Sequence, residues 1–172
     1  MTDFQILLEK LHACPEARDW VADRTAKQAW QECQRIDWMF WLVEHLVHEN
    51  DLHCEIVMCA NDFARSALQF TSDQRVADCV AAVDRWLAGE LVDLTAAARA
   101  AEATEVVARA TGAAARAAEA GWSSEAVWSA HVAAQAAARA TTLTNADIIR
   151  RHLPWSKVGP LIERSYVSPV KT

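Results

Sequence analysis

Histidines and cysteines crowd one short stretch of the chain, EHLVHENDLHCEIVMC. It holds five candidate metal ligands: His45, His48, His53, Cys54 and Cys59. Imidazole nitrogens and thiolates bind zinc at comparable spacings, and two histidines three residues apart share one face of a helix. The stretch nevertheless lacks both a C-x-x-C pair and an H-E-x-x-H motif. These residues are therefore weak candidates, and we predict that the protein holds no metal and no other cofactor.

The same stretch carries four carboxylates, Glu44, Glu49, Asp51 and Glu55. We expect them to form an acidic tip where one helix turns into the next. This tip is the surface that we predict to bind a protein partner. Carboxylates on a surface also serve solubility alone, and that alternative stays open.

Charged side chains gather at two other places. These are Arg35 with Asp37, and a cluster of Asp147, Arg150, Arg151 and His152. The arginines of such a cluster could hold a phosphate or a carboxylate. The alternative is structural: Asp37 would be an N-cap, Asp147 would close a capping box, and the arginines would stabilise the last turn of a helix.

Motifs of the common catalytic classes do not occur in the sequence. We find no G-x-S-x-G elbow, no P-loop and no dinucleotide-binding fingerprint. Cysteines and histidines are present, but no pattern places one beside another. We therefore expect a protein that is not an enzyme.

The composition predicts that helices position these residues. Alanine is abundant, only four glycines and four prolines occur, and apolar residues recur at three and four rather than at two. We predict an all-α single domain over residues 1–172, a bundle of about nine or ten helices. The expected helices lie near 3–13, 15–23, 26–34, 38–49, 52–70, 73–88, 95–120, 123–141 and 145–153, with a short turn at 156–164.

Helix ends are marked by residues that satisfy free backbone groups. Four capping boxes are expected, pairing Thr2 with Gln5, Thr25 with Gln28, Thr71 with Gln74, and Thr144 with Asp147. Gly89 and Gly121 stand where helices should end, because glycine enters the left-handed conformation easily.

Four large apolar residues follow one another in WMFW, Trp38 to Trp41. Successive residues of a helix turn by about 100°, so this block covers the whole circumference. A helix that is apolar all round is normally a central one, and we predict that the block is core. Trp20, Trp30 and Trp86 are the residues expected to pack around it.

The segment 95–141 is rich in alanine, with arginines and glutamates between. It could be a solvated linker, but its charges balance, and small side chains let helices approach closely. We predict a tightly packed helical pair here, followed by the short C-terminal helices of residues 145–164.

Several features predict a protein of the cytoplasm. No apolar run approaches the ~20 residues of a membrane-spanning helix, and the first residues, MTDFQILLEK, lack the pattern of a signal peptide. In that reducing compartment the five cysteines should be small buried hydrophobes rather than disulfides.

Charge divides the chain into two unequal parts. Residues 1–94 carry 8 Lys or Arg against 17 Asp or Glu, a net charge of −9, whereas residues 95–172 carry 9 against 6, a net charge of +3. An acidic front half repels phosphate backbones and disfavours nucleic acid as a ligand. It would speed encounter with a basic partner. Eight tryptophans leave a homodimer possible.

The segment AWQECQRIDWMFWLVEHL resembles the signature of a helical family of immunity proteins of bacterial polymorphic toxin systems, the fifth such family, which also occurs in phages. The matching residues there are Trp30, Cys33, Arg35, Asp37, Trp38 and Trp41. VAAVDRWLAGE is similar at Trp86, Gly89 and Glu90, and NADIIRRHLPW at Ala146, Asp147, Ile148, Arg150, Pro154 and Trp155. The likeness spans roughly residues 12–160. Ile36 departs from it, since the family has glycine there, and this predicts a different turn or mild strain.

The resemblance implies an all-helical protein that binds and neutralises a toxin by stoichiometric interaction. A basic, nuclease-like toxin would suit the acidic front half. Two other functions stay open. The chain could be a phage-encoded inhibitor of a bacterial defence system, such as a CRISPR effector, or a helical protein that binds a small molecule or a metal.

Overall fold

The protein is all-α. A computed structural model describes residues 2–47, 52–70, 72–97, 118, 126–127, 129–130, 132–133 and 146–167, and no strand occurs among them. The helices are α1 (Asp3–Lys10), α2 (Pro15–Val21), α3 (Ala26–Glu32), α4 (Ile36–Leu46), α5 (His53–Ala67), the 3-10 turn η1 (Leu68–Phe70), α6 (Gln74–Leu87), α10 (Ala146–His152) and α11 (Trp155–Val167). Each matches an expected helix, with ends that differ by a few residues.

The first two capping boxes are confirmed. The amide of Thr2 donates to Gln5 Oε1 at 2.8 Å and the amide of Gln5 donates to Thr2 Oγ1 at 3.2 Å. Thr25 and Gln28 repeat the arrangement at 2.9 and 3.2 Å at the start of α3. Gly89 ends the helical turn after α6 with a φ of 88°, the left-handed conformation expected of it.

Two predicted N-cap residues are wrong. Helix α6 begins directly after Asp73, whose carboxylate accepts the amide of Arg75 at 3.0 Å, so Thr71 is not its N-cap. Helix α4 begins at Ile36, which places Asp37 inside the first turn rather than at the N-cap. Ile36 is thus helical, and the strain expected from its departure from glycine does not occur.

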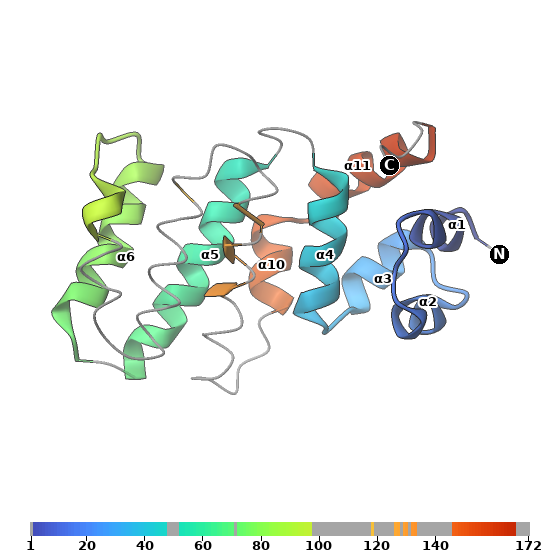
Figure 1. Cartoon of the computed structure of the whole chain (residues 1–172), viewed down its shortest axis with the longest axis horizontal. Helices are drawn as coiled ribbons and strands as arrows, with labels where there is room; N and C mark the ends of the chain where they lie inside the picture. The colour runs from blue at the N-terminus through green and yellow to red at the C-terminus, as the bar shows by residue number, and fades with distance from the viewer. Residues whose placement is uncertain are drawn as a thin grey trace.

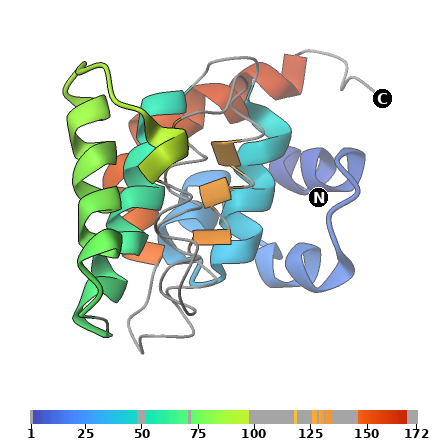
Figure 2. The same ribbon diagram turned by 60° about the vertical axis from the view of Figure 1, so that its left-hand side comes forward.

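The C-terminal helices return to the middle of the molecule. Helix α10 contacts both α4 and α5, and α11 contacts α1, α3 and α4. Figure 1 shows the resulting order, with α6 at one end, then α5, α10 and α4, and α1 with α2 at the other end. The turned view of Figure 2 keeps α6 and the α1–α2 pair on opposite sides. Buried side chains from all of these helices form one continuous cluster, as a single domain requires.

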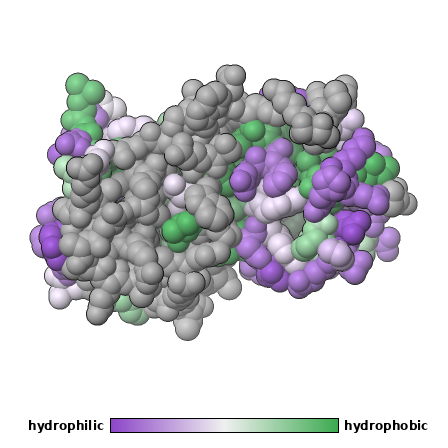
Figure 3. Space-filling model, in the orientation of Figure 1, coloured by the Kyte–Doolittle hydropathy of each residue, from purple (hydrophilic) through white to green (hydrophobic). Residues whose placement is uncertain are grey.

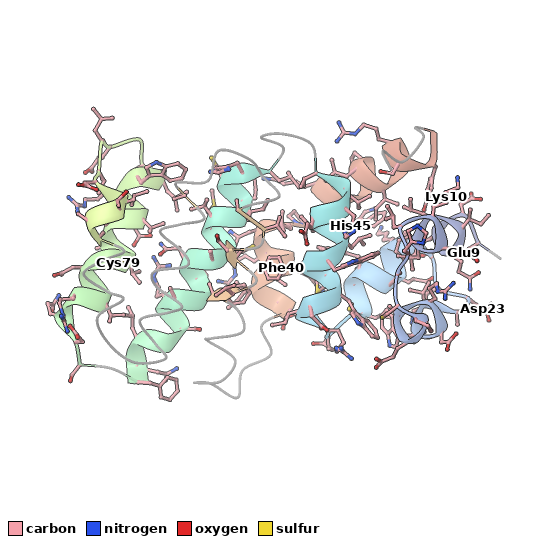
Figure 4. All side chains as sticks on the ribbon, viewed as in Figure 1. Glu9, Lys10, Asp23, Phe40, His45 and Cys79 are labelled. Carbon is pink, nitrogen blue, oxygen red and sulfur yellow. The ribbon has the colours of Figure 1, made fainter. Side chains whose placement is uncertain are left out.

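Only half of the WMFW block lies in the core. Met39 and Phe40 are buried, whereas Trp38 and Trp41 are half-buried. Phe40 faces α5, where its ring meets that of Phe63 edge-on at 6.0 Å between centroids (Figure 4). Neighbouring helices therefore enclose one side of α4, and the two tryptophans reach the surface.

The described residues between 118 and 133 of the alanine-rich segment are buried or half-buried, whereas Thr95 and Ala96 at its start are exposed. Those that are buried are Ala118, Ala126, Val127, Ser129, Ala130 and Ala133. Their burial agrees with packing against the bundle rather than with a solvated linker. The expected helical pair as a whole lies outside the described residues, as do Gly121 and Thr144.

The cysteines fulfil their prediction in part. Cys33, Cys59 and Cys79 are buried, but Cys14 and Cys54 are exposed. None of the helices within the described ranges combines the length and the apolar character needed to cross a bilayer.

Candidate functional site

An open pocket of about 400 Å³ lies between α2, the start of α4 and the turn before α2. The described residues that line it are Ala13, Cys14, Glu16, Ala17, Arg35, Asp37, Trp38, Phe40, Trp41, Glu44 and Val127. Figure 3 colours the surface by hydropathy, and in the half of the molecule that contains these helices hydrophilic residues surround residues of intermediate and apolar character. The lining combines three carboxylates and one arginine with aromatic rings, and we call it the acidic–aromatic pocket.

Arg35 binds two of the three carboxylates. Its Nε and Nη2 donate to the two oxygens of Asp37 at 2.9 and 2.7 Å, and its Nη1 donates to Glu16 at 3.1 Å. The hydrogen bonds from Arg35 hold the pKa of Asp37 below its usual range, and the same pair raises the pKa of Arg35. The predicted pairing of Arg35 with Asp37 is therefore present, and the contact of Arg35 with Glu16 ties the start of α4 to α2.

Guanidinium groups also cover two of the indole rings on this side. The Cζ atom of Arg35 lies 4.4 Å from the ring centre of Trp38, and that of Arg24 lies 4.6 Å from the ring centre of Trp20. The two indoles contact each other, with 6.0 Å between their centroids. A cation over an indole face is attracted by the electron density of the ring, so both contacts are favourable.

Glu44 and Trp41 stand one turn further along α4. Glu44 is half-buried in the pocket wall, and it makes no hydrogen bond or ion pair within the described part of the chain. The imidazole of His45 lies against Trp41, with 4.3 Å between ring centroids, and His45 Nδ1 is 2.7 Å from the Trp41 carbonyl oxygen. This end of the pocket therefore holds a carboxylate that has no cationic partner among the described residues, and an indole that the His45 ring contacts but no described arginine or lysine covers.

Replacing Asp37 by asparagine should have a small effect that depends on pH. Because the pKa of Asp37 is lower in the folded state than the ~3.9 of an unfolded chain, its contribution is present above that value and disappears as the pH falls through the folded pKa. The side chain is 42% exposed, so we expect at most about 1 kcal/mol at pH 7. Urea unfolding of both proteins at pH 7 and at low pH measures the difference.

Asp23→Asn is the matched control for this experiment. Asp23 is exposed and forms no ion pair among the described residues, so its removal should leave the free energy of unfolding unchanged at both pH values. A loss from Asp37→Asn that stayed constant down to low pH would contradict the ion-pair explanation.

The second predicted polar cluster is divided between two structural contacts. Arg150 reaches α3, where its Nε donates to the Trp30 carbonyl at 3.1 Å and its Nη2 to the Cys33 carbonyl, while Nη1 donates to Asp147 at 2.7 Å. In return, Trp30 Nε1 donates to the Leu153 carbonyl at 3.0 Å. Arg150 is thus a structural residue that joins α10 to the end of α3.

Arg151 and His152 turn instead toward α5. Asp62 lies 2.8 Å from His152 Nε2 and 3.2 Å from Arg151 Nη1, and it also accepts from Arg65 at 2.6 Å. Arg65 in turn holds Asp84 on α6 at 2.6 Å. Arg150 thus binds the end of α3, whereas Arg151 and His152 bind Asp62 of α5, so the four residues of the cluster do not converge on one site for a phosphate or a carboxylate.

The acidic tip is not a single surface in the described residues. Glu44 lines the acidic–aromatic pocket, whereas Glu55 binds Lys157 Nζ on α11. Burial is the largest single influence and raises the pKa of Glu55, but the hydrogen bond and the charge of Lys157, together with a backbone hydrogen bond, outweigh it, so the pKa of Glu55 lies below its usual value. Glu49 and Asp51 lie outside the described residues. Sequence reasoning missed Glu16, because no pattern links a residue of α2 to one of α4.

The candidate metal ligands point to different neighbours. His45 lies against Trp41, the ring of His53 lies 6.0 Å from that of Trp86, Cys54 is exposed and Cys59 is fully buried. Within the described ranges no three side chains of His, Cys, Asp or Glu gather as a metal site would need. His48 lies outside those ranges.

The buried thiols of Cys33 and Cys59 are poor nucleophiles. Burial raises the pKa of the Cys59 thiol and also that of Cys33, whose Sγ lies 3.5 Å from the Arg35 carbonyl oxygen. Because the thiolate is the reactive form, both side chains are held in the unreactive state.

Comparison with known proteins gives no match among protein families, curated proteins or solved structures. The resemblance to the immunity proteins therefore depends on the quoted segments alone. Two of these segments, which contain Trp30 with Cys33 and Arg150 with Leu153, lie far apart in the sequence and meet in the fold.

Proposed function

We propose that this chain binds a basic protein partner and neutralises it by stoichiometric interaction, as the resemblance to immunity proteins implies. The observation that carries the proposal is the acidic–aromatic pocket. Its wall contains three carboxylates, Glu16, Asp37 and Glu44, against the single cation of Arg35. Such a pocket favours a cationic group over an anionic one.

Two features of the chain support a protein as the partner. The net charge of −9 over residues 1–94 extends the attraction well beyond the pocket and would raise the rate of encounter with a basic surface. Half-buried tryptophans such as Trp38 and Trp41 are the side chains that most often anchor protein interfaces. Together, the negative charge and the tryptophans suit a protein partner that is first attracted by charge and then held on aromatic rings.

The test is capture of the partner by the tagged chain from its native host, with identification by mass. We expect a single basic protein, and we expect the double variant Glu16→Lys/Glu44→Lys to bind it at least about tenfold more weakly, because two attractive charges become repulsive. The control is Asp78→Lys/Glu90→Lys, which makes the same change of charge at exposed positions in and after α6, at the other end of the molecule. The control should bind like the unchanged chain.

Neutralisation is tested in cells that express the captured partner. A toxin should stop their growth, and co-expression of the chain should restore it, whereas the Glu16→Lys/Glu44→Lys variant should not. Equal loss of binding in both double variants would contradict the pocket as the binding surface. Capture of a bacterial defence complex in place of a toxin would favour the phage-inhibitor function instead.

A further inference from the structure

We propose that the acidic–aromatic pocket recognises an arginine side chain of the partner, which lies on Trp41 and pairs with Glu44. The inference rests on the proposed function for its assumption that the partner is a protein. It adds the chemical group that the pocket selects and the two residues that select it.

Two indoles on this side of the molecule already lie against arginines of the chain itself. Arg35 and Arg24 lie over Trp38 and Trp20 at 4.4 and 4.6 Å, so two neighbouring indoles are each covered by a guanidinium. Trp41 and Trp38 are the two indoles among the described residues that line the acidic–aromatic pocket. Within the described part of the chain, no arginine or lysine lies over Trp41. The ring of His45 lies against Trp41 with 4.3 Å between centroids, and the part of the indole that lines the pocket is offered to a guanidinium from outside.

Glu44 is the third carboxylate of the acidic–aromatic pocket. Glu16 and Asp37 already accept hydrogen bonds from Arg35, and only Glu44 of the three carboxylates lacks a cation among the described residues. Residues three apart on a helix lie on the same face, so Trp41 and Glu44 are neighbours along α4. An indole face beside a carboxylate matches both the flat surface and the charge of a guanidinium.

The choice of arginine over lysine follows from hydration and shape. An ammonium group is compact and strongly hydrated, so it loses more on entering a pocket with aromatic walls than a guanidinium does. A guanidinium is planar, stacks on an indole, and can still donate to a carboxylate in its own plane. A volume of about 400 Å³ exceeds what one side chain needs, which leaves room for the peptide that carries the arginine.

The test uses a five-residue peptide, acetyl-Gly-Gly-Arg-Gly-Gly-amide, and its counterparts with lysine and with citrulline, the neutral isostere of arginine. Each is titrated into the ¹⁵N-labelled full chain, and the indole N–H signal of Trp41, assigned from its loss in Trp41→Phe, reports binding. We expect a saturable shift with the arginine peptide, binding at least about threefold weaker with lysine, and no shift with citrulline.

Glu44→Gln tests the carboxylate with almost no change of shape. We expect it to weaken the arginine peptide about tenfold. Glu90→Gln is the matched control, since Glu90 is exposed beyond α6, and it should leave the binding unchanged. A citrulline peptide that bound as well as arginine, or a Glu44→Gln chain that bound like the original, would overturn the inference.

The outcome separates this inference from the proposed function. A captured protein whose binding depends on Glu16 and Glu44, together with no preference for the arginine peptide, would keep the function and refute the arginine site. Arginine-peptide binding in a chain that captures no protein would uphold the guanidinium site and contradict the proposed function.

Discussion

Replacing Phe63 by alanine is expected to lower the free energy of unfolding by about 3–5 kcal/mol. Phe63 is 0% exposed on α5, and its ring meets Phe40 of α4 edge-on. Alanine would remove the buried ring and leave a cavity at the centre of the bundle, where surrounding helices cannot collapse into it fully. Urea unfolding followed by circular dichroism measures the loss.

Phe70 provides the matched control, because it is also a phenylalanine of the same region but is 52% exposed in η1. Phe70→Ala should change the free energy of unfolding by less than about 0.5 kcal/mol. Similar losses from the two substitutions would mean that Phe63 is not enclosed as the structure has it.

The helices of this protein could be predicted because their signals are local. A capping box such as Thr2 with Gln5 needs only residues three apart, and Gly89 ends its helix through its own backbone conformation. Errors arose where a neighbouring residue could serve equally well. Asp73 caps α6 in place of Thr71, since both types of side chain accept from a free amide.

The burial of the WMFW block could be predicted only in part. The apolar character of Trp38 to Trp41 indicates that a helix is wrapped, but it does not tell which side the neighbours cover. Phe40 is buried and its ring meets Phe63 of α5, whereas Trp38 and Trp41 remain half-buried in the wall of the pocket. An indole tolerates this position because it is large and apolar and also carries a polar N–H.

The candidate site, too, could be predicted from the sequence only in part. Sequence reasoning singled out Arg35, Asp37 and Glu44, but it assigned them to two different sites and missed Glu16. Their meeting depends on how α2 packs against α4, and helical periodicity contains no information about which helices meet. The division of the second cluster between α3 and α5 could not be predicted for the same reason.

Arg150 is expected to be the most important charged residue for stability among those singled out from the sequence. Arg150→Ala should lower the free energy of unfolding by about 2–4 kcal/mol. Its side chain is 18% exposed and donates to the carbonyls of Trp30 and Cys33, two residues that are themselves buried. Alanine would leave both acceptors without their charged donor. Arg150→Lys should recover less than half, since one ammonium cannot span both carbonyls as the guanidinium fork does.

Arg151→Ala is the matched control on the adjacent residue. Arg151 is 66% exposed and pairs with Asp62, so its removal should cost less than about 1 kcal/mol. If the two arginine variants unfolded alike, the junction of α10 with α3 would not contribute as the geometry indicates.

A double-mutant cycle with Trp30→Phe then tests whether the junction acts as a unit. Trp30 donates from Nε1 to the Leu153 carbonyl while its own carbonyl accepts from Arg150, so the two losses should be coupled by about 0.5–3 kcal/mol. Coupling of that size would explain why Trp30, Cys33 and Arg150 stand among the residues that carry the resemblance: they join two distant segments of the fold.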